Sequence, residues 1–205
     1  MTIQESLLQK PLEKMNGCNI QEVFKEIAKN LFNNFYIHCG ERKYYFVEVE
    51  FYYYDKEKYL LDQERYKWYG VTYSRTNKSA GDFFYHLSGF DIYFNSHYDE
   101  NHQTGSGGLV RSIKDEKGLL TTGPLTCKDL ILNSCGNEMP KLESYKPEVE
   151  IKLESTIRSL GKEDMNNRID GNLNLCFYDG SIKDWKPTKQ RFDTKTGRTV
   201  KSYSS

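Results

Sequence analysis

The sequence has no excess charge of either sign, because its 29 Lys and Arg residues balance its 29 Asp and Glu residues. A neutral chain has no overall field that attracts a polyanion, so any contact with nucleic acid must be local. It also has no apolar run near the roughly 18 residues of a membrane span, and its N-terminal part contains no signal-peptide core. We therefore predict a cytoplasmic protein with no membrane partner.

Cysteines are few and are poorly spaced for a metal. The five cysteines are an odd number and include no CxxC pair and no zinc spacing, which argues against a disulfide framework and against a metal site. We predict no metal and no other cofactor, and reduced structural thiols at Cys18, Cys39, Cys127, Cys135 and Cys176.

Proline is scarce, with five residues, whereas the chain has 16 tyrosines and 11 phenylalanines. Aromatic residues favour β strands and supply flat surfaces with a polar edge. A chain of 205 residues is long enough to bury one sizeable core. We predict one domain over 1–205 that is mostly β.

The N-terminal part divides into a leader, a helix and a strand. Residues 1–17 are polar and end in a turn signal, so we expect a loosely held leader. Apolar residues then recur at helical spacing from Ile20 to Leu31, after a capping box of Asn19 and Glu22. From 44 to 54 the period becomes two, which predicts a strand with Phe46, Glu48, Glu50, Tyr52 and Tyr54 on one face.

Turn signals divide the remainder of the chain. Two aromatic runs, 83–87 and 90–95, flank Ser88-Gly89 and predict a hairpin. The glycines of 105–108 predict a flexible loop before a strand over 109–113, and Thr122-Gly123-Pro124 precedes a helix expected over 126–134. Residues 136–167 are expected to form loops and 172–178 a strand. The C-terminal segment 183–205 is basic, with seven basic and two acidic residues between 183 and 201, a net charge of +5.

Glu50 is the candidate catalytic carboxylate. A carboxyl group beside Phe46, Tyr52 and Tyr54 would be partly desolvated, which would raise its pKa and make it a better base. Cleavage of a base from its sugar passes through an oxocarbenium-like state that a carboxylate stabilises, and an aromatic ring can hold the departing base. Glu50 and Tyr52 therefore match an N-glycosidase. No function is assigned to the four histidines.

Several short motifs occur in the order found in one family. The string Phe46-Val47-Glu48-Val49-Glu50-Phe51-Tyr52 resembles the VETEAY strand of the alkyladenine type of 3-methyladenine DNA glycosylase. Gly89-Phe90-Asp91-Ile92-Tyr93-Phe94-Asn95 is similar to that family's GMYFCMN stretch, and 108–113 to its VLLRAL strand. Residues 122–125 resemble its SGP helix start and Arg168-Ile169 its late RVG strand. The resemblance covers about 44–133 and 166–192.

The resemblance implies the family's compact α+β fold, with a curved antiparallel sheet flanked by a few helices. It also implies a monofunctional hydrolysis without a Schiff-base lysine or a metal. It implies that Glu50 activates water, that Arg111 lies near the flipped nucleotide, and that Tyr85 and Asn95 line the base pocket. Two features depart from the family: Ser88 replaces its intercalating tyrosine, and 55–80 contain no histidine. The expected site comprises catalytic Glu50 and Arg111; substrate-binding Tyr52, Tyr85, Asn95, Glu48 and Ser88; and DNA-binding Lys186, Lys189 and Arg191.

We therefore expect a monomeric DNA glycosylase that hydrolyses the N-glycosidic bond of a flipped, modified base in DNA and leaves an abasic site. The departures favour a bulky base, such as a glucosylated hydroxymethylcytosine of phage DNA, and a role in antiviral defence. The alternatives are repair of alkylated purines, a non-catalytic nucleic-acid reader, and an N-glycosidase of nucleosides or nucleotides. The basic C-terminal residues would bind DNA phosphates or would simply be solvated.

Overall fold

The computed structural model describes residues 2–13, 20–55, 57, 79–98, 103–159, 173–183, 185, 190–193 and 198–201. Three helices lie within this part: η1 (Glu5–Gln9) continuing into α1 (Lys10–Glu13), then α2 (Ile20–Asn34) and α5 (Pro124–Cys135). The strands are β1 (Phe35–Cys39), β2 (Arg42–Asp55), β3 (Phe83–His86), β4 (Gly89–Tyr98), β5 (Gln103–Asp115), β6 (Leu120–Thr122), β7 (Lys141–Ser144), β8 (Leu153–Ser159), β9 (Leu173–Asp179), β10 (Gln190–Asp193) and β11 (Arg198–Lys201).

The nine strands β1–β9 form one antiparallel sheet with the long strands β2 and β5 at its centre. The main order is β3-β4-β5-β2-β1-β7, and β6 pairs with β5 while β9 joins β8 to β2. Strand β2 pairs with β1 through residues 42–44 and with β9 through residues 48–51, and the sheet curls into a half-barrel. Strands β10 and β11 form a separate two-stranded sheet.

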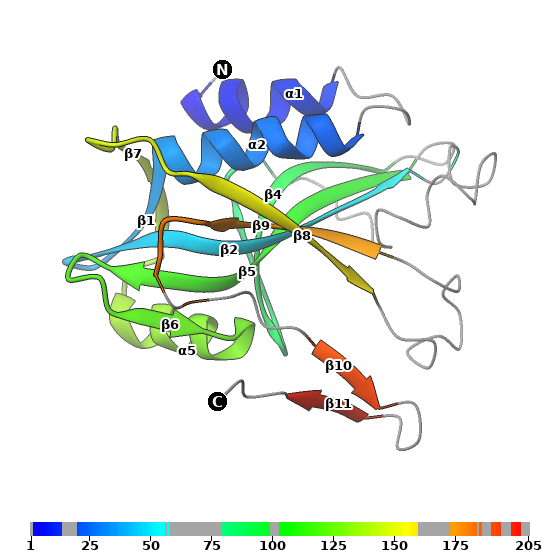
Figure 1. Ribbon diagram of the computed structural model, residues 1–205. Helices are drawn as coiled ribbons and strands as arrows, with labels where there is room; N and C mark the ends of the chain where they lie inside the picture. Colours follow the sequence, from blue (N-terminus) through cyan, green and yellow to red (C-terminus); the bar gives the residue numbers. More distant parts are fainter. Residues whose placement is uncertain are drawn as a thin grey trace.

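Helix α2 packs against the sheet through the apolar stripe predicted for it. Ile20, Phe24, Ile27 and Leu31 are fully buried, and the ring of Phe32 lies 6.1 Å from that of Phe46 on β2. Figure 1 shows α1 and α2 together along one side of the sheet and α5 on the opposite side, below β6. The α+β single domain with a curved antiparallel sheet is therefore confirmed.

Strand β2 does not keep one period from end to end, which corrects the predicted faces. Phe46, Val49 and Phe51 all belong to the hydrophobic core, so the alternation breaks between 46 and 49. The register shifts at both steps from Phe46 through Glu48 to Val49, which is a bulge region in the pairing with β5. Phe46 therefore points into the core, and Glu48 and Glu50 do not.

The glycine run 105–108 lies inside β5 and is not a flexible loop. An added Cβ at Gly107 would lie 2.6 Å from the hydroxyl of Tyr52, and one at Gly108 would lie 2.6 Å from Cγ1 of Val49. These glycines allow the side chains of β2 to lie across β5, and the predicted loop is wrong because a close approach, not a turn, requires them.

Two other segments predicted to be irregular have regular structure. Within the leader, residues 5–13 are helical, and Leu8 is fully buried, because the segment packs against α2. Within 136–167, strands β7 and β8 add to two edges of the sheet, as their pairing with β1 and β9 shows. The hairpin is present, but its predicted turn at Ser88-Gly89 is wrong by one residue: His86 already pairs with Gly89, so the turn consists of Leu87 and Ser88.

Cys39 at the end of β1 and Cys135 at the end of α5 form a disulfide across 96 residues of sequence. The prediction of reduced thiols is wrong for this pair, because the fold brings the C-terminus of α5 beside the β1–β2 turn. Cys127 is a free, buried thiol, Cys176 is buried, and Cys18 lies outside the described residues.

Candidate functional site

Strand β2 carries Glu48, Glu50 and Tyr52 in the middle of the sheet, after the bulge. Glu50 pairs with Leu109 of β5 on one side and with Cys176 of β9 on the other. Because neighbouring strands cover both its sides, Glu50 is only 5% exposed and Glu48 only 1%. Carboxylates are rarely buried this completely unless they are paired, so a partner is expected nearby.

Arg111 of β5 is that partner. Its Nη1 donates to Oε2 of Glu50 at 2.7 Å, and its Nε lies 3.6 Å from Oε1 of Glu48. The hydroxyl of Ser112 donates to Oε2 of Glu48 at 3.3 Å. A charge-assisted hydrogen bond of this length favours the carboxylate form of Glu50 and fixes its orientation.

The backbone of Arg111 is held by the N-terminus of α5. The carbonyl of Arg111 accepts a hydrogen bond from the N–H of Gly123 at 2.7 Å, and the thiol of Cys127 lies 3.5 Å from the same oxygen. Burial raises the pKa of the Cys127 thiol to about 12, so this group stays protonated and serves packing. Helix α5 therefore fixes the strand position from which Arg111 reaches Glu50.

A second polar cluster connects β2 to the β3–β4 hairpin. The hydroxyl of Tyr52 donates to Oδ2 of Asp91 at 2.7 Å, and Oδ1 of Asp91 lies 3.4 Å from Nε2 of His86. Nδ1 of His86 lies 3.1 Å from Oγ of Ser88 in the exposed turn. Asp91 pairs with Leu109, the residue that also pairs with Glu50, so both carboxylates lie on one face of the sheet.

Asp91 and His86 were not among the site residues predicted from the sequence. A usable signal was present, because residues flanking a two-residue turn face each other and Asp91 is two residues beyond Gly89. The observed register therefore brings His86, Ser88 and Asp91 together near the tip of the hairpin.

Replacement of Gly107 by alanine tests how tightly Tyr52 is seated. The new Cβ would lie 2.6 Å from the Tyr52 hydroxyl and 2.9 Å from the carbonyl of Ile92. We expect Gly107→Ala to lower the free energy of unfolding by about 1–3 kcal/mol in urea denaturation. Adding Tyr52→Phe should recover part of that loss, and a Gly107→Ala protein as stable as the original would contradict the close approach.

The other predicted site residues are placed as follows. Tyr85 packs between Phe83 and Phe90, and its buried hydroxyl has no hydrogen-bond partner among the described residues, while burial raises its pKa. Asn95 pairs through its backbone with Ser106, but its side chain lies outside what the structure describes, as does that of Arg191 in β10. Lys186, Lys189, Arg168 and Ile169 also lie outside the described residues.

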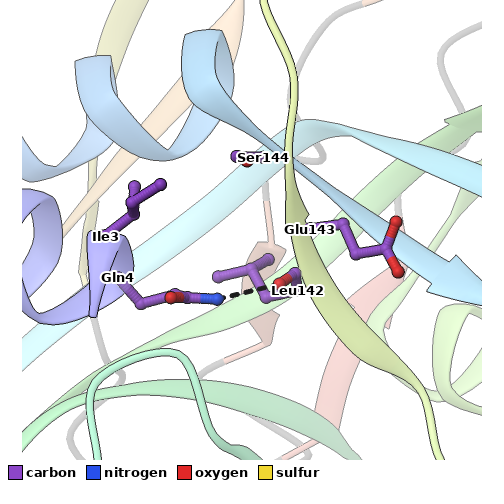
Figure 2. A pocket seen from close by; sticks show the side chains of 5 residues that line it. All are labelled: Ile3, Gln4, Leu142, Glu143 and Ser144. Atoms are coloured by element: carbon purple, nitrogen blue, oxygen red, sulfur yellow. Dashed lines mark hydrogen bonds between the residues drawn. The ribbon is translucent and has the colours of Figure 1, made fainter.

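A hollow of about 370 Å³ lies away from these clusters, between the N-terminal helix and β7. It is lined by Ile3, Gln4, Leu142, Glu143 and Ser144, and the amide of Gln4 donates to the carbonyl of Leu142 at 3.1 Å. Figure 2 shows the Glu143 carboxylate pointing away from Ile3 and Gln4. That carboxylate accepts from the hydroxyl of Tyr36 at 2.5 Å and lies 2.7 Å from Nδ1 of His38.

Within the described ranges, no three His, Cys, Asp or Glu side chains are grouped so that they could hold a metal ion. None of the helices in those ranges is long and apolar enough to cross a membrane.

The buried Glu50–Arg111 pair and the Tyr52–Asp91–His86–Ser88 cluster thus form one candidate site on β2, β5, β4 and the hairpin tip. Comparison with protein-family models, with curated proteins and with solved structures finds no match to this chain.

Proposed function

We propose that the protein is a monofunctional DNA N-glycosylase in which Glu50 activates water against the sugar of a flipped, modified nucleotide. The observation that carries this proposal is the buried carboxylate of Glu50, held 2.7 Å from the guanidinium of Arg111. A fixed, ionised carboxylate in a poorly solvated site is suited to take a proton from water and to stabilise an oxocarbenium-like sugar.

The charges around Glu50 favour such a transition state. Glu48 and Glu50 bring two carboxylates together beside the guanidinium of Arg111. Positive charge develops on the sugar as the bond to the base breaks, and nearby carboxylates stabilise it. Tyr52 and the half-buried Phe84 and His86 add flat rings on which a base can stack.

The order of motifs along the chain also supports this reaction. Glu50, Tyr85, Asn95, Arg111 and the start of α5 follow one another as the corresponding motifs do in the alkyladenine glycosylases that they resemble. A curled antiparallel sheet with its carboxylate on the central strand is compatible with that family's fold. The predicted substrate, a bulky modified base of phage DNA, and a role in defence remain proposals.

Leu87 is a candidate to fill the space left by the flipped base, because Ser88 cannot. Leu87 is 94% exposed at the hairpin tip, and Nζ of Lys128 donates at 3.0 Å to the carbonyls of His86 and Leu87. Apolar side chains inserted between base steps stabilise flipped or kinked DNA, and a nearby ammonium favours phosphate.

Leu87→Ser is expected to slow base release from duplex DNA about tenfold, because about 1.4 kcal/mol of apolar contact is lost. Release from single-stranded DNA should be unchanged, since no gap is then filled. Leu119→Ser, at a residue 71% exposed in another loop, serves as the control. Equal slowing on both kinds of DNA would argue against an inserted Leu87.

The proposed reaction is tested by incubating the protein with a panel of modified and unmodified DNAs and identifying any released base by mass. Alkali cleavage of the treated DNA detects the abasic sites that must accompany the base. Tight binding with no free base would support a non-catalytic reader instead. Inhibition by mononucleotides, with their hydrolysis, would support a nucleotide N-glycosidase.

A further inference from the structure

The cluster at the hairpin tip is a continuous polar chain from a buried carboxylate to an exposed hydroxyl. Asp91 is 4% exposed and accepts from Tyr52 at 2.7 Å, while its other oxygen lies 3.4 Å from Nε2 of His86. On the far side of the ring, Nδ1 lies 3.1 Å from the exposed hydroxyl of Ser88. A carboxylate that orients an imidazole, which in turn contacts a hydroxyl, is an arrangement suited to moving a proton.

These polar side chains lie on the same face of the sheet as Glu50, at a distance that leaves room for a nucleotide. Glu50 and Asp91 pair with the two sides of Leu109, so their backbones are two strand spacings apart, about 10 Å. Inverting glycosidases separate their acid and base by roughly 6.5–9.5 Å between carboxyl groups, because a sugar and a water must fit between them. A nucleotide with its sugar near Glu50 can therefore direct its base toward His86.

We infer that His86 supplies the proton that the departing base needs, with Ser88 as relay and Asp91 as the positioning residue. The inference rests on the proposed glycosylase function and extends it by naming the substrate class. The substrates are nucleotides whose base must be protonated before it can leave as a neutral molecule.

In the proposed hydrolysis, Glu50 takes up one proton and His86 supplies one. Water loses a proton to Glu50 as its oxygen bonds to C1′ of the sugar, and the bond from C1′ to the base nitrogen breaks. The electron pair of that bond stays on the base, which takes a proton from the hydroxyl of Ser88. The proton on Nδ1 of His86 then moves to the oxygen of Ser88. Until that transfer, Asp91 stabilises the positively charged imidazole ring.

The groups that face His86 come from three elements. Asp91 approaches from β4, Ser88 from the turn, and Nζ of Lys128 from α5, where it lies 3.0 Å from the His86 carbonyl. The ring of Phe84 stacks beside the imidazole at 6.0 Å. The imidazole therefore lies between a carboxylate and a hydroxyl, as the proposed proton transfer requires.

The test compares a leaving group that needs a proton with one that does not. DNA duplexes carrying one hypoxanthine or one 7-methylguanine are incubated with the full-length protein under single-turnover conditions. 7-Methylguanine already carries a positive charge and leaves without an acid. His86→Gln is expected to slow release of hypoxanthine about 100-fold, the lower range for loss of an acid, and release of 7-methylguanine less than threefold.

Two further variants serve as a control for His86→Gln and as a test of the relay through Ser88. His38→Gln is the matched control, because His38 also faces a carboxylate, Glu143, at 2.7 Å but lies on β1, and both rates should stay unchanged. Ser88→Ala, in an exposed turn where folding is not at risk, should selectively slow hypoxanthine release about tenfold. Equal slowing of both bases by His86→Gln, or wild-type inactivity on both, overturns the inference. If no DNA of the wider panel loses a base, the glycosylase function itself fails.

Discussion

Glutamine in place of Glu50 is expected to slow base release about 1000-fold while the protein still folds and binds DNA. Glutamine keeps the size of the side chain and an oxygen that can accept from Arg111, but it cannot take a proton from water. The rate is measured under single-turnover conditions as alkali-sensitive sites formed in the DNA. Circular dichroism and urea denaturation show whether the variant is folded.

Glu48→Gln and Glu154→Gln are the matched controls for this change. Glu48 shares Arg111 but lies 3.6 Å from it, so we expect a smaller loss of rate from Glu48→Gln. Glu154 forms its hydrogen bond with Tyr178 at 2.8 Å, and Glu154→Gln should leave the rate unchanged. A fully active Glu50→Gln protein would show that the Glu50–Arg111 pair only stabilises the sheet.

Loss of the disulfide is expected to cause the largest change in stability. Cys39→Ser opens a loop of 96 residues, and the chain-entropy relation gives about 4–5 kcal/mol for a loop of that length. The free energy of unfolding is measured in urea with and without a reducing agent. The reducing agent should lower the transition of the original protein to that of Cys39→Ser and should not affect the variant.

A transition that does not respond to reduction would show that Cys39 and Cys135 are thiols in solution. Reducing compartments keep most cysteines reduced, so the result also bears on the predicted cytoplasmic location. Because α5 carries Gly123 and Cys127 against the carbonyl of Arg111, opening the disulfide should loosen the site as well as the fold.

Local patterns in the sequence were sufficient to predict α2, the β3–β4 hairpin and the central strand. For α2 the apolar period alone determines which residues can be buried together, and the burial of Phe24, Ile27 and Leu31 confirms it. For β2 the period predicted the strand but not the faces of its side chains. The contact of Glu50 with Arg111 was predicted only through the resemblance, because 61 residues separate the two in sequence.

Other features could not be predicted because they depend on contacts between distant segments. The break of period at 46–49 arises from the pairing of β2 with β5, and no residue of β2 reveals it. The glycines of β5 indicated a loop because their function, room for Tyr52 and Val49, lies on another strand. Pairing of Cys39 with Cys135 likewise requires the curl of the sheet.

One measurement tests the central claim most directly. Wild-type protein and Glu50→Gln are incubated in parallel with glucosylated and unmodified phage DNA and with alkylated DNA, and small molecules released into solution are identified by mass. We predict a free base from at least one modified DNA with the wild-type protein and a rate about 1000-fold lower with Glu50→Gln. Equal release by both proteins, or tight binding without any release, would contradict a catalytic role for Glu50.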